Sequence, residues 1–243
     1  MNEFLWVEKY RPKNIEHCIL PDDLKKTFKS FVDAGEVPNL LLCGTAGIGK
    51  TTVAKALCHE LGVDSIVING SDEGRFLDTV RNSAKQFAST VSLTSSAKHK
   101  VIIIDEADNT THDVQLLLRA SIEEFQNNCR FIFTCNFKNK IIQPLHSRTT
   151  VIDCNTRGKQ KQQIATQFFE RCRGILTAEN IQFTDAVVAE VVQKFFPDFR
   201  RTLNELQRYA ASGVIDTGIL AQISQIRLEK LVGALKTKDF GAT

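Results

Sequence analysis

The sequence lacks the features of a secreted, membrane-spanning or zinc-binding chain. No apolar run approaches the roughly 20 residues that a helix needs to cross a bilayer. The first residues, MNEFLWVEK, contain neither the basic start nor the apolar core of a signal peptide. The seven cysteines include no C-x-x-C pair and most lie in apolar stretches, which favours structural thiols over a zinc site. These absences predict a cytosolic protein that has no membrane partner.

The composition is that of a folded globular chain. With 243 residues, of which 42% are hydrophobic and 24% charged, the chain is long enough for one large and one small domain. A formal net charge of +3 does not establish nucleic-acid binding, because such binding depends on a clustered basic surface rather than on total charge. Composition and net charge therefore do not indicate a function, whereas the sequence motifs of the chain do.

Residues 1–155 predict an α/β domain. Short apolar runs alternate there with longer amphipathic stretches, and these runs read NLLLC, SIVIN, VIIID, RFIFTCN and VIDC. Such alternation predicts a mainly parallel five-stranded sheet flanked by helices, with ligands at the carboxyl ends of the strands. After residue 155 the strand signal disappears, and successive stretches with helical spacing predict a small helical domain over residues 156–243.

A phosphate-binding motif, G-x-x-x-x-G-K-[ST], occupies residues 44–51, directly between the first apolar run and a helical stretch. Its glycines allow backbone N–H groups to face the phosphates of a nucleotide. Lys50 is expected to reach the β and γ oxygens, and the Thr51 hydroxyl to bind Mg²⁺. The motif predicts ATP and Mg²⁺ as cofactors, with binding residues Gly44, Thr45, Ala46, Gly47, Ile48, Gly49, Lys50, Thr51 and Thr52.

Two acidic residues end the third apolar run, about 55 residues after Lys50. Asp105 is expected to hold Mg²⁺ through water, and Glu106 to polarise the attacking water as a general base. A helix N-cap would explain Asp105 alone equally well, but the preceding phosphate motif favours catalysis. Asn136 closes the fourth run, where its amide could orient the water or contact the γ-phosphate. Capping of the following turn is the alternative for Asn136.

In this order, GTAGIGKT, VIIIDEAD and FIFTCN resemble the Walker A, Walker B and sensor-1 elements of AAA+ ATPases, which combine a RecA-like sheet domain with a helical lid. WVEKYRPKNIEHCILP resembles the adenine-side box of clamp-loader ATPases such as replication factor C. PLHSRTT is similar to their Ser-Arg-Cys motif, and FPDFRRTLNELQ to their sensor-2 segment. With NGSD and SGVIDTGIL, the likeness runs over nearly the whole chain and points to the ATPase subunits of T-even-type phage clamp loaders.

The resemblance implies roles for residues outside the phosphate motif. Arg148 would be the arginine finger that completes the site of a neighbouring subunit, although Thr149 stands where the family has Cys. A solvated loop cation is the alternative for Arg148. Arg200 would be sensor 2, with Arg201 as its solvated neighbour. The base pocket would consist of Val7, Tyr10, Arg11, Pro12 and Ile19.

The resemblance also implies that the protein is a DNA-stimulated ATPase that opens a sliding clamp and loads it onto primer-template DNA. Its partners would be the clamp, the DNA and the other subunits of a pentameric ring, in the cytoplasm of a phage-infected host. Arg75, Arg81 and Lys85 follow NGSD on one helical stretch and are the candidate DNA contacts, although a solvated helix face explains the same charges.

Two other functions stay open at this point. One is a different AAA+ remodeller of nucleoprotein, and the other is a scaffold subunit that binds ATP without hydrolysing it. The family carries a third, helical collar domain that holds the ring together. This domain is expected to be missing from the present chain, which stops at Thr243 just after the lid.

Overall fold

The computed structural model describes residues 4–71, 85–89, 99–211 and 213–215. By their contacts the residues fall into two units, one spanning Arg11–Ile164 and the other combining Met1–Tyr10 with Ala165–Thr243. Arg75 and Arg81 lie outside the described residues, as does the amphipathic stretch at residues 218–236. The domain boundary after residue 155 stays a prediction.

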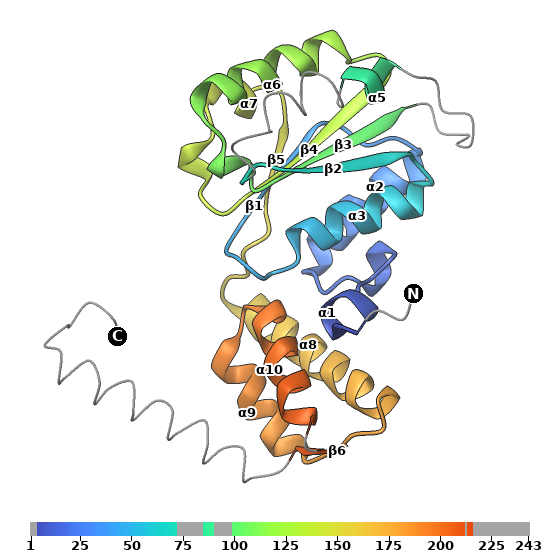
Figure 1. The fold of residues 1–243 in the computed structure, drawn as a ribbon, viewed down its shortest axis with the longest axis vertical. Coiled ribbons are helices and arrows are strands. Elements are labelled where there is room, and N and C mark those ends of the chain that lie inside the picture. The colour runs from blue at the N-terminus through green and yellow to red at the C-terminus, as the bar shows by residue number, and fades with distance from the viewer. Residues whose placement is uncertain (1–3, 72–84, 90–98, 212, 216–243) are drawn as a thin grey trace, which may run out of the picture. The chain divides into compact units, whose positions relative to one another are not determined.

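The unit Arg11–Ile164 is built on a five-stranded sheet, as predicted (Figure 1). Its neighbouring strands are all parallel and lie in the order β2-β3-β4-β1-β5. The central strands read as unbroken apolar runs because helices cover both of their faces. The strands are β1 (Leu40–Cys43), β2 (Ser65–Asn69), β3 (Lys100–Asp105), β4 (Cys129–Cys135) and β5 (Thr150–Asp153).

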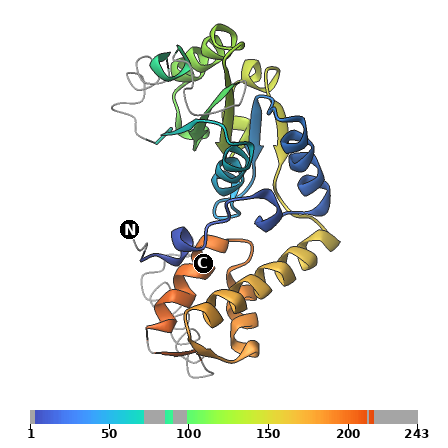
Figure 2. The same ribbon diagram turned by 90° about the vertical axis from the view of Figure 1, so that its right-hand side faces the viewer.

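Two hydrophobic cores lie on opposite faces of this sheet (Figure 1 and Figure 2). Alternate strand residues point to each face, so that Ile103 packs with α2 and α3 whereas Ile102 and Ile104 pack with α6. All seven cysteines are free and buried, in agreement with their predicted structural role. The helices are η1 (Ile15–His17), α2 (Asp22–Ala34), α3 (Lys50–Leu61), α5 (Lys85–Ser89), η3 (Ala107–Asn109), α6 (His112–Glu124), η4 (Lys138–Lys140) and α7 (Gln143–His146).

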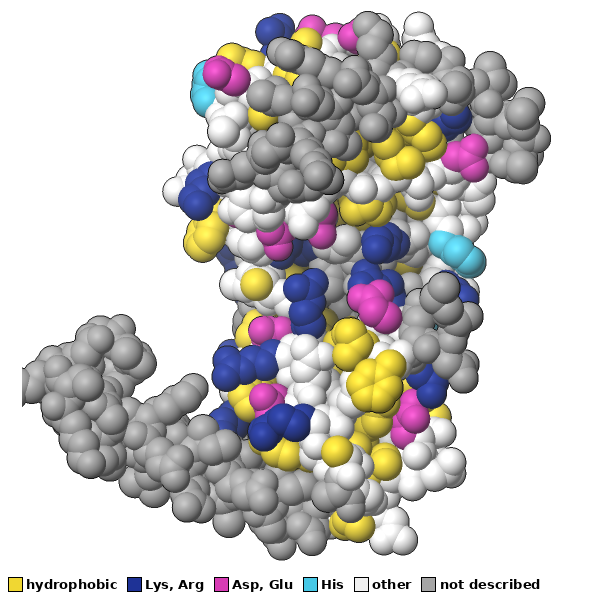
Figure 3. Space-filling model, viewed as in Figure 1, with side chains coloured by type: hydrophobic (Ala, Val, Ile, Leu, Met, Phe, Trp, Pro, Cys, Tyr) yellow, Lys and Arg dark blue, Asp and Glu magenta, His cyan; other side chains and the backbone are white. Residues whose placement is uncertain are grey.

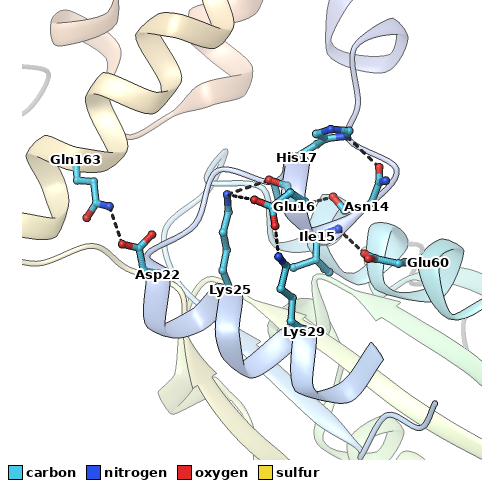
Figure 4. Close-up of polar contacts among 10 residues, drawn as sticks. Asn14, Ile15, Glu16, His17, Asp22, Lys25, Lys29, Glu60 and Gln163 are labelled. Atoms are coloured by element: carbon cyan, nitrogen blue, oxygen red, sulfur yellow. Dashed lines mark hydrogen bonds and ion pairs between the residues drawn. The ribbon is translucent and has the colours of Figure 1, made fainter. Parts of the chain in front are cut away.

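The segment before α2 is fixed onto α2 and α3 (Figure 4). The Ile15 N–H donates to Glu60 Oε2 at 2.7 Å, and Ile15 itself is fully buried. Lys25 Nζ donates to the Glu16 carbonyl at 2.9 Å, while the Glu16 carboxylate pairs with Lys29. These contacts hold the backbone that carries Arg11, Pro12 and Ile19 against the sheet domain.

The other unit is mainly helical. It contains α1 (Trp6–Lys9), α9 (Asp185–Phe195), α10 (Phe199–Ala210) and most of α8 (Lys159–Ala178), inside which the two units divide. Its buried side chains include Phe168, Cys172, Val188 and Leu206. A short parallel pair of strands, β6 (Gln182–Phe183) and β7 (Val214–Ile215), was not predicted, because two residues are too few to produce a strand pattern.

Candidate nucleotide site

The phosphate motif forms the loop between β1 and α3, as its sequence context predicts. Gly44 has a φ of 151°, and a Cβ added there would lie 2.5 Å from Ile48 Cδ1. Gly49, with a φ of 92°, stands directly before the first turn of α3. A residue with a Cβ atom is strained at such φ values, so glycine is needed for the loop to turn into the helix. The backbone N–H groups of the loop then lie at the helix N-terminus.

Lys50 joins this loop to the end of β4. It is 8% exposed, and its Nζ donates to the Gly44 carbonyl at 2.7 Å, the Thr45 carbonyl at 2.8 Å and Asn136 Oδ1 at 2.9 Å. Burial lowers the pKa of this ammonium below its ordinary value. All three acceptors are neutral, so charged phosphate oxygens can replace them with a gain in hydrogen-bond strength.

The two predicted magnesium ligands lie side by side. Thr51 Oγ1 donates to Asp105 Oδ1 at 2.6 Å. Thr134, on the neighbouring strand β4, donates to the same oxygen at 2.6 Å and thereby fixes the carboxylate. A hydroxyl and a carboxylate supply the hard oxygen ligands that Mg²⁺ prefers, so this pair fits the ion.

Glu106 follows Asp105 in the left-handed region, with a φ of 54°. Its backbone N–H donates to Thr134 Oγ1 at 3.0 Å. Asn109 Nδ2 donates to Glu106 Oε2 at 3.1 Å, and the Ser71 hydroxyl contacts the same oxygen. Two polar side chains thus orient the Glu106 carboxylate, and neither of them is a predicted magnesium ligand.

Asp108, the last residue of the acidic motif, supports Asn136. It is 5% exposed, and its Oδ2 accepts the backbone N–H groups of Asn136 at 3.1 Å and Phe137 at 3.0 Å. Asn136 thereby faces Lys50 with its side-chain oxygen. The sequence predicts Asn136 at the site but gives no signal for the role of Asp108, since that role depends on the proximity of η3 to the end of β4.

The residues predicted for the base pocket are divided between the two units. Val7 and Tyr10 belong to the helical unit, whereas Arg11, Pro12 and Ile19 belong to the sheet unit, so the base pocket stays a prediction. Arg200, in the first turn of α10, is exposed and stays a predicted sensor.

Arg201 and Arg148 are both held by contacts within their own units. The Arg201 guanidinium lies over the Phe195 ring, 4.8 Å from its centroid, and the choice of Arg200 rather than Arg201 as the sensor stays a prediction. Arg148 follows α7 and pairs with Glu123 at the end of α6.

The candidate DNA contacts stay a prediction. Lys85 begins α5, while Arg75 and Arg81 lie outside the described residues. On the face shown in Figure 3, basic side chains of the described residues are interspersed with acidic ones.

The described helices include none that is long and apolar enough to cross a membrane. Within the same residues, no group of three or more His, Cys, Asp or Glu side chains could hold a metal ion.

Comparison with known proteins agrees with this geometry. The profile of the ATPase family associated with various cellular activities (AAA) matches residues 40–155. That of the sliding-clamp-loader large subunit AAA+ ATPase lid domain matches residues 160–221. Among solved structures, the RuvB Holliday junction branch migration motor of Thermotoga maritima has a TM-score of 0.68 at 20% identity, covering 89% of this chain and 72% of its own. This likeness shows the fold.

Curated relatives are more similar in sequence. The sliding-clamp-loader large subunit of Escherichia phage RB69 is 41% identical over 98% of this chain and 75% of its own length. That of Enterobacteria phage T4 is 40% identical over the same shares. The replication factor C small subunit of Archaeoglobus fulgidus is 34% identical over 96% of this chain and 73% of its own. The protein is thus a nucleotide-binding ATP hydrolase, and it belongs to the AAA+ clamp-loader ATPases, the family of these phage and archaeal subunits.

Proposed function

We propose that the protein is the ATPase subunit of a loader that opens a sliding clamp and places it on primer-template DNA. The observation that carries this proposal is the convergence of Lys50, Thr51, Asp105 and Asn136 at the carboxyl ends of β1, β3 and β4 in a chain of the clamp-loader family. Sheet folds of this kind bind ligands at that edge.

The proposed reaction is phosphoryl transfer from ATP to water. The water oxygen forms a bond to the γ-phosphorus, the bond from that phosphorus to the β,γ-bridging oxygen breaks, and Glu106 takes the proton of the water. Lys50 and Asn136 bind the phosphoryl oxygens and stabilise the charge that develops on them. Thr51 and Asp105 would hold Mg²⁺, which when bound supplies further positive charge beside the phosphates.

In the assembled ring, Arg148 would reach the nucleotide of a neighbouring subunit, and Arg200 would contact the γ-phosphate within its own chain. Both arginines would then link the nucleotide state to the orientation of the domains. Arg75, Arg81 and Lys85 would follow the DNA backbone, giving affinity with little sequence preference. ATP hydrolysis and clamp loading would take place in the cytoplasm, with the clamp and the other loader subunits as partners.

The test is the ATP turnover rate of the assembled protein with and without primer-template DNA and a sliding clamp. We expect both to stimulate turnover, and we expect Glu106→Gln to abolish it while ATP binding persists. If neither DNA nor clamp stimulates turnover, the loader proposal is overturned and the ATPase assignment stands. Unchanged turnover in Glu106→Gln would instead overturn the role of Glu106 as general base.

A further inference from the structure

A carboxylate in the last turn of α6 binds the guanidinium of Arg148, 25 residues further along the chain. Arg148 Nε donates to Glu123 Oε1 at 2.9 Å, and Arg148 Nη2 donates to the same oxygen at 2.6 Å. The Arg148 side chain is 29% exposed and that of Glu123 is 52% exposed. The pair therefore lies at the surface, where an arginine without such a partner would sample many rotamers.

The Nη1 nitrogen of Arg148 is bound by its own loop. Nη1 donates to the Pro144 carbonyl at 3.0 Å and to the Ser147 hydroxyl at 3.2 Å. These two acceptors are neutral, whereas the acceptor on the Nε side is a carboxylate. Charge-assisted hydrogen bonds are roughly twice as strong as neutral ones. A phosphate oxygen can therefore displace Pro144 and Ser147 from Nη1 while Glu123 retains its hold on Nε.

Glu123 is itself kept ionised and oriented. The hydrogen bond from Arg148 and then the charge of Arg119 lower the pKa of this carboxyl below its ordinary value. Arg119 Nη2, one helical turn earlier on α6, lies 3.6 Å from Glu123 Oε1. Two guanidinium groups thus face one carboxylate, so Glu123 is charged at neutral pH and its position is defined from two sides.

We propose that Glu123 is a positioning residue for Arg148, holding the guanidinium in the orientation in which it reaches the nucleotide of a neighbouring subunit. The inference rests on the proposed role of Arg148 in trans. Its physical basis is that an arginine already held along one side loses less rotational freedom when it engages the transferring phosphoryl group. Glu123 would contact neither the nucleotide nor the reacting atoms, and would act through Arg148.

The experiment is a double-mutant cycle on ATP turnover by the assembled complex in the presence of DNA and clamp. The variants are Glu123→Ala, Arg148→Ala and both together, with Glu123→Gln as the conservative replacement and Asp113→Asn, an exposed carboxylate on the same helix, as the control. Steady-state kcat and KM for ATP are measured, along with the affinity of each variant for a fluorescent ATP analogue.

We expect Glu123→Ala to lower kcat about three- to tenfold with KM and nucleotide affinity changed less than about twofold. Glu123→Gln keeps the acceptor oxygen and should recover most of this loss, and Asp113→Asn should match the wild type. Because Glu123 acts through Arg148, the double variant should be no slower than Arg148→Ala. If Glu123→Ala does not assemble, Glu123→Asp takes its place in the cycle, since it withdraws the carboxylate by one methylene and keeps the charge.

Two results would overturn the inference alone: full activity of Glu123→Ala beside an impaired Arg148→Ala, or losses in the two single variants that multiply in the double variant. Full activity of Arg148→Ala would overturn the trans role of Arg148 and the inference together. The failure of the inference is therefore distinguishable from failure of the function on which it rests.

Discussion

At the scale of single residues, the site depends on side chains that orient the predicted catalytic residues. Asp108 is buried and accepts the backbone N–H groups of Asn136 and Phe137. Asp108→Ala would leave both without that acceptor, so we expect unfolding free energy to fall by about 1–3 kcal/mol. Turnover should also fall because Asn136 loses its support. Urea denaturation and steady-state kinetics measure the two effects.

Asp113→Ala is the matched control for this variant. Its carboxylate lies in the first turn of α6 and its side chain is 93% exposed, so its removal should cost no more than a few tenths of a kcal/mol, the weak interaction of a surface charge with the helix dipole. Equal stability of the Asp108 and Asp113 variants would contradict the role given to Asp108.

The sequence predicts the site residues more completely than the contacts that orient them. Lys50, Thr51 and Asp105 follow from motif and spacing, because the phosphate loop and the acidic strand end have fixed chemical tasks. The role of Thr134 cannot be predicted from motif and spacing. Its place beside Asp105 requires β4 to lie next to β3 in the register that pairs Ile104 with Phe133. Glu123 likewise approaches Arg148 only once α6 packs near α7. Such contacts depend on tertiary packing, for which the sequence gives no periodic signal.

At the scale of elements, the end of β5 is tied to the phosphate loop between β1 and α3. Asn155, two residues after β5, accepts the Thr45 N–H at 3.0 Å and donates to Asp153 Oδ1 at 2.8 Å. The pairing of β5 with β1 places Asp153 opposite Cys43, directly before the loop. Asn155 therefore fixes the first residues of the loop to the edge of the sheet.

Asn155→Ala should raise the dissociation constant for an ATP analogue about two- to tenfold, as expected for the loss of one neutral hydrogen bond that preorganises the loop. Isothermal titration measures this change. Asn139→Ala, an exposed replacement in η4, serves as the control and should bind as tightly as the wild type. An affinity equal to that of the control would show that the Asn155 contact does not contribute to nucleotide binding.

At the scale of the whole molecule, the first residues belong to the helical unit rather than to the sheet domain that follows them in sequence. The Trp6 N–H donates to Gln207 Oε1 at 3.0 Å, and Gln207 Nε2 donates to the Phe4 carbonyl at 2.8 Å. Trp6 is the single tryptophan of the chain and is 6% exposed. Its fluorescence therefore reports on the helical unit, to which Trp6 belongs, whereas circular dichroism reports on both units.

Each unit has its own buried core, so we expect the two to unfold in separate steps. In urea, the transition seen by Trp6 fluorescence should not coincide with the one seen by circular dichroism. Coincident transitions in the wild type would instead indicate that the two units unfold as one cooperative body.

The contact between α1 and α10 can be tested with the same fluorophore. Gln207→Ala should shift Trp6 emission to the red and increase its quenching by acrylamide, because α1 loses a polar contact to α10. Gln193→Ala, an exposed replacement in α9, should leave the emission and the quenching unchanged.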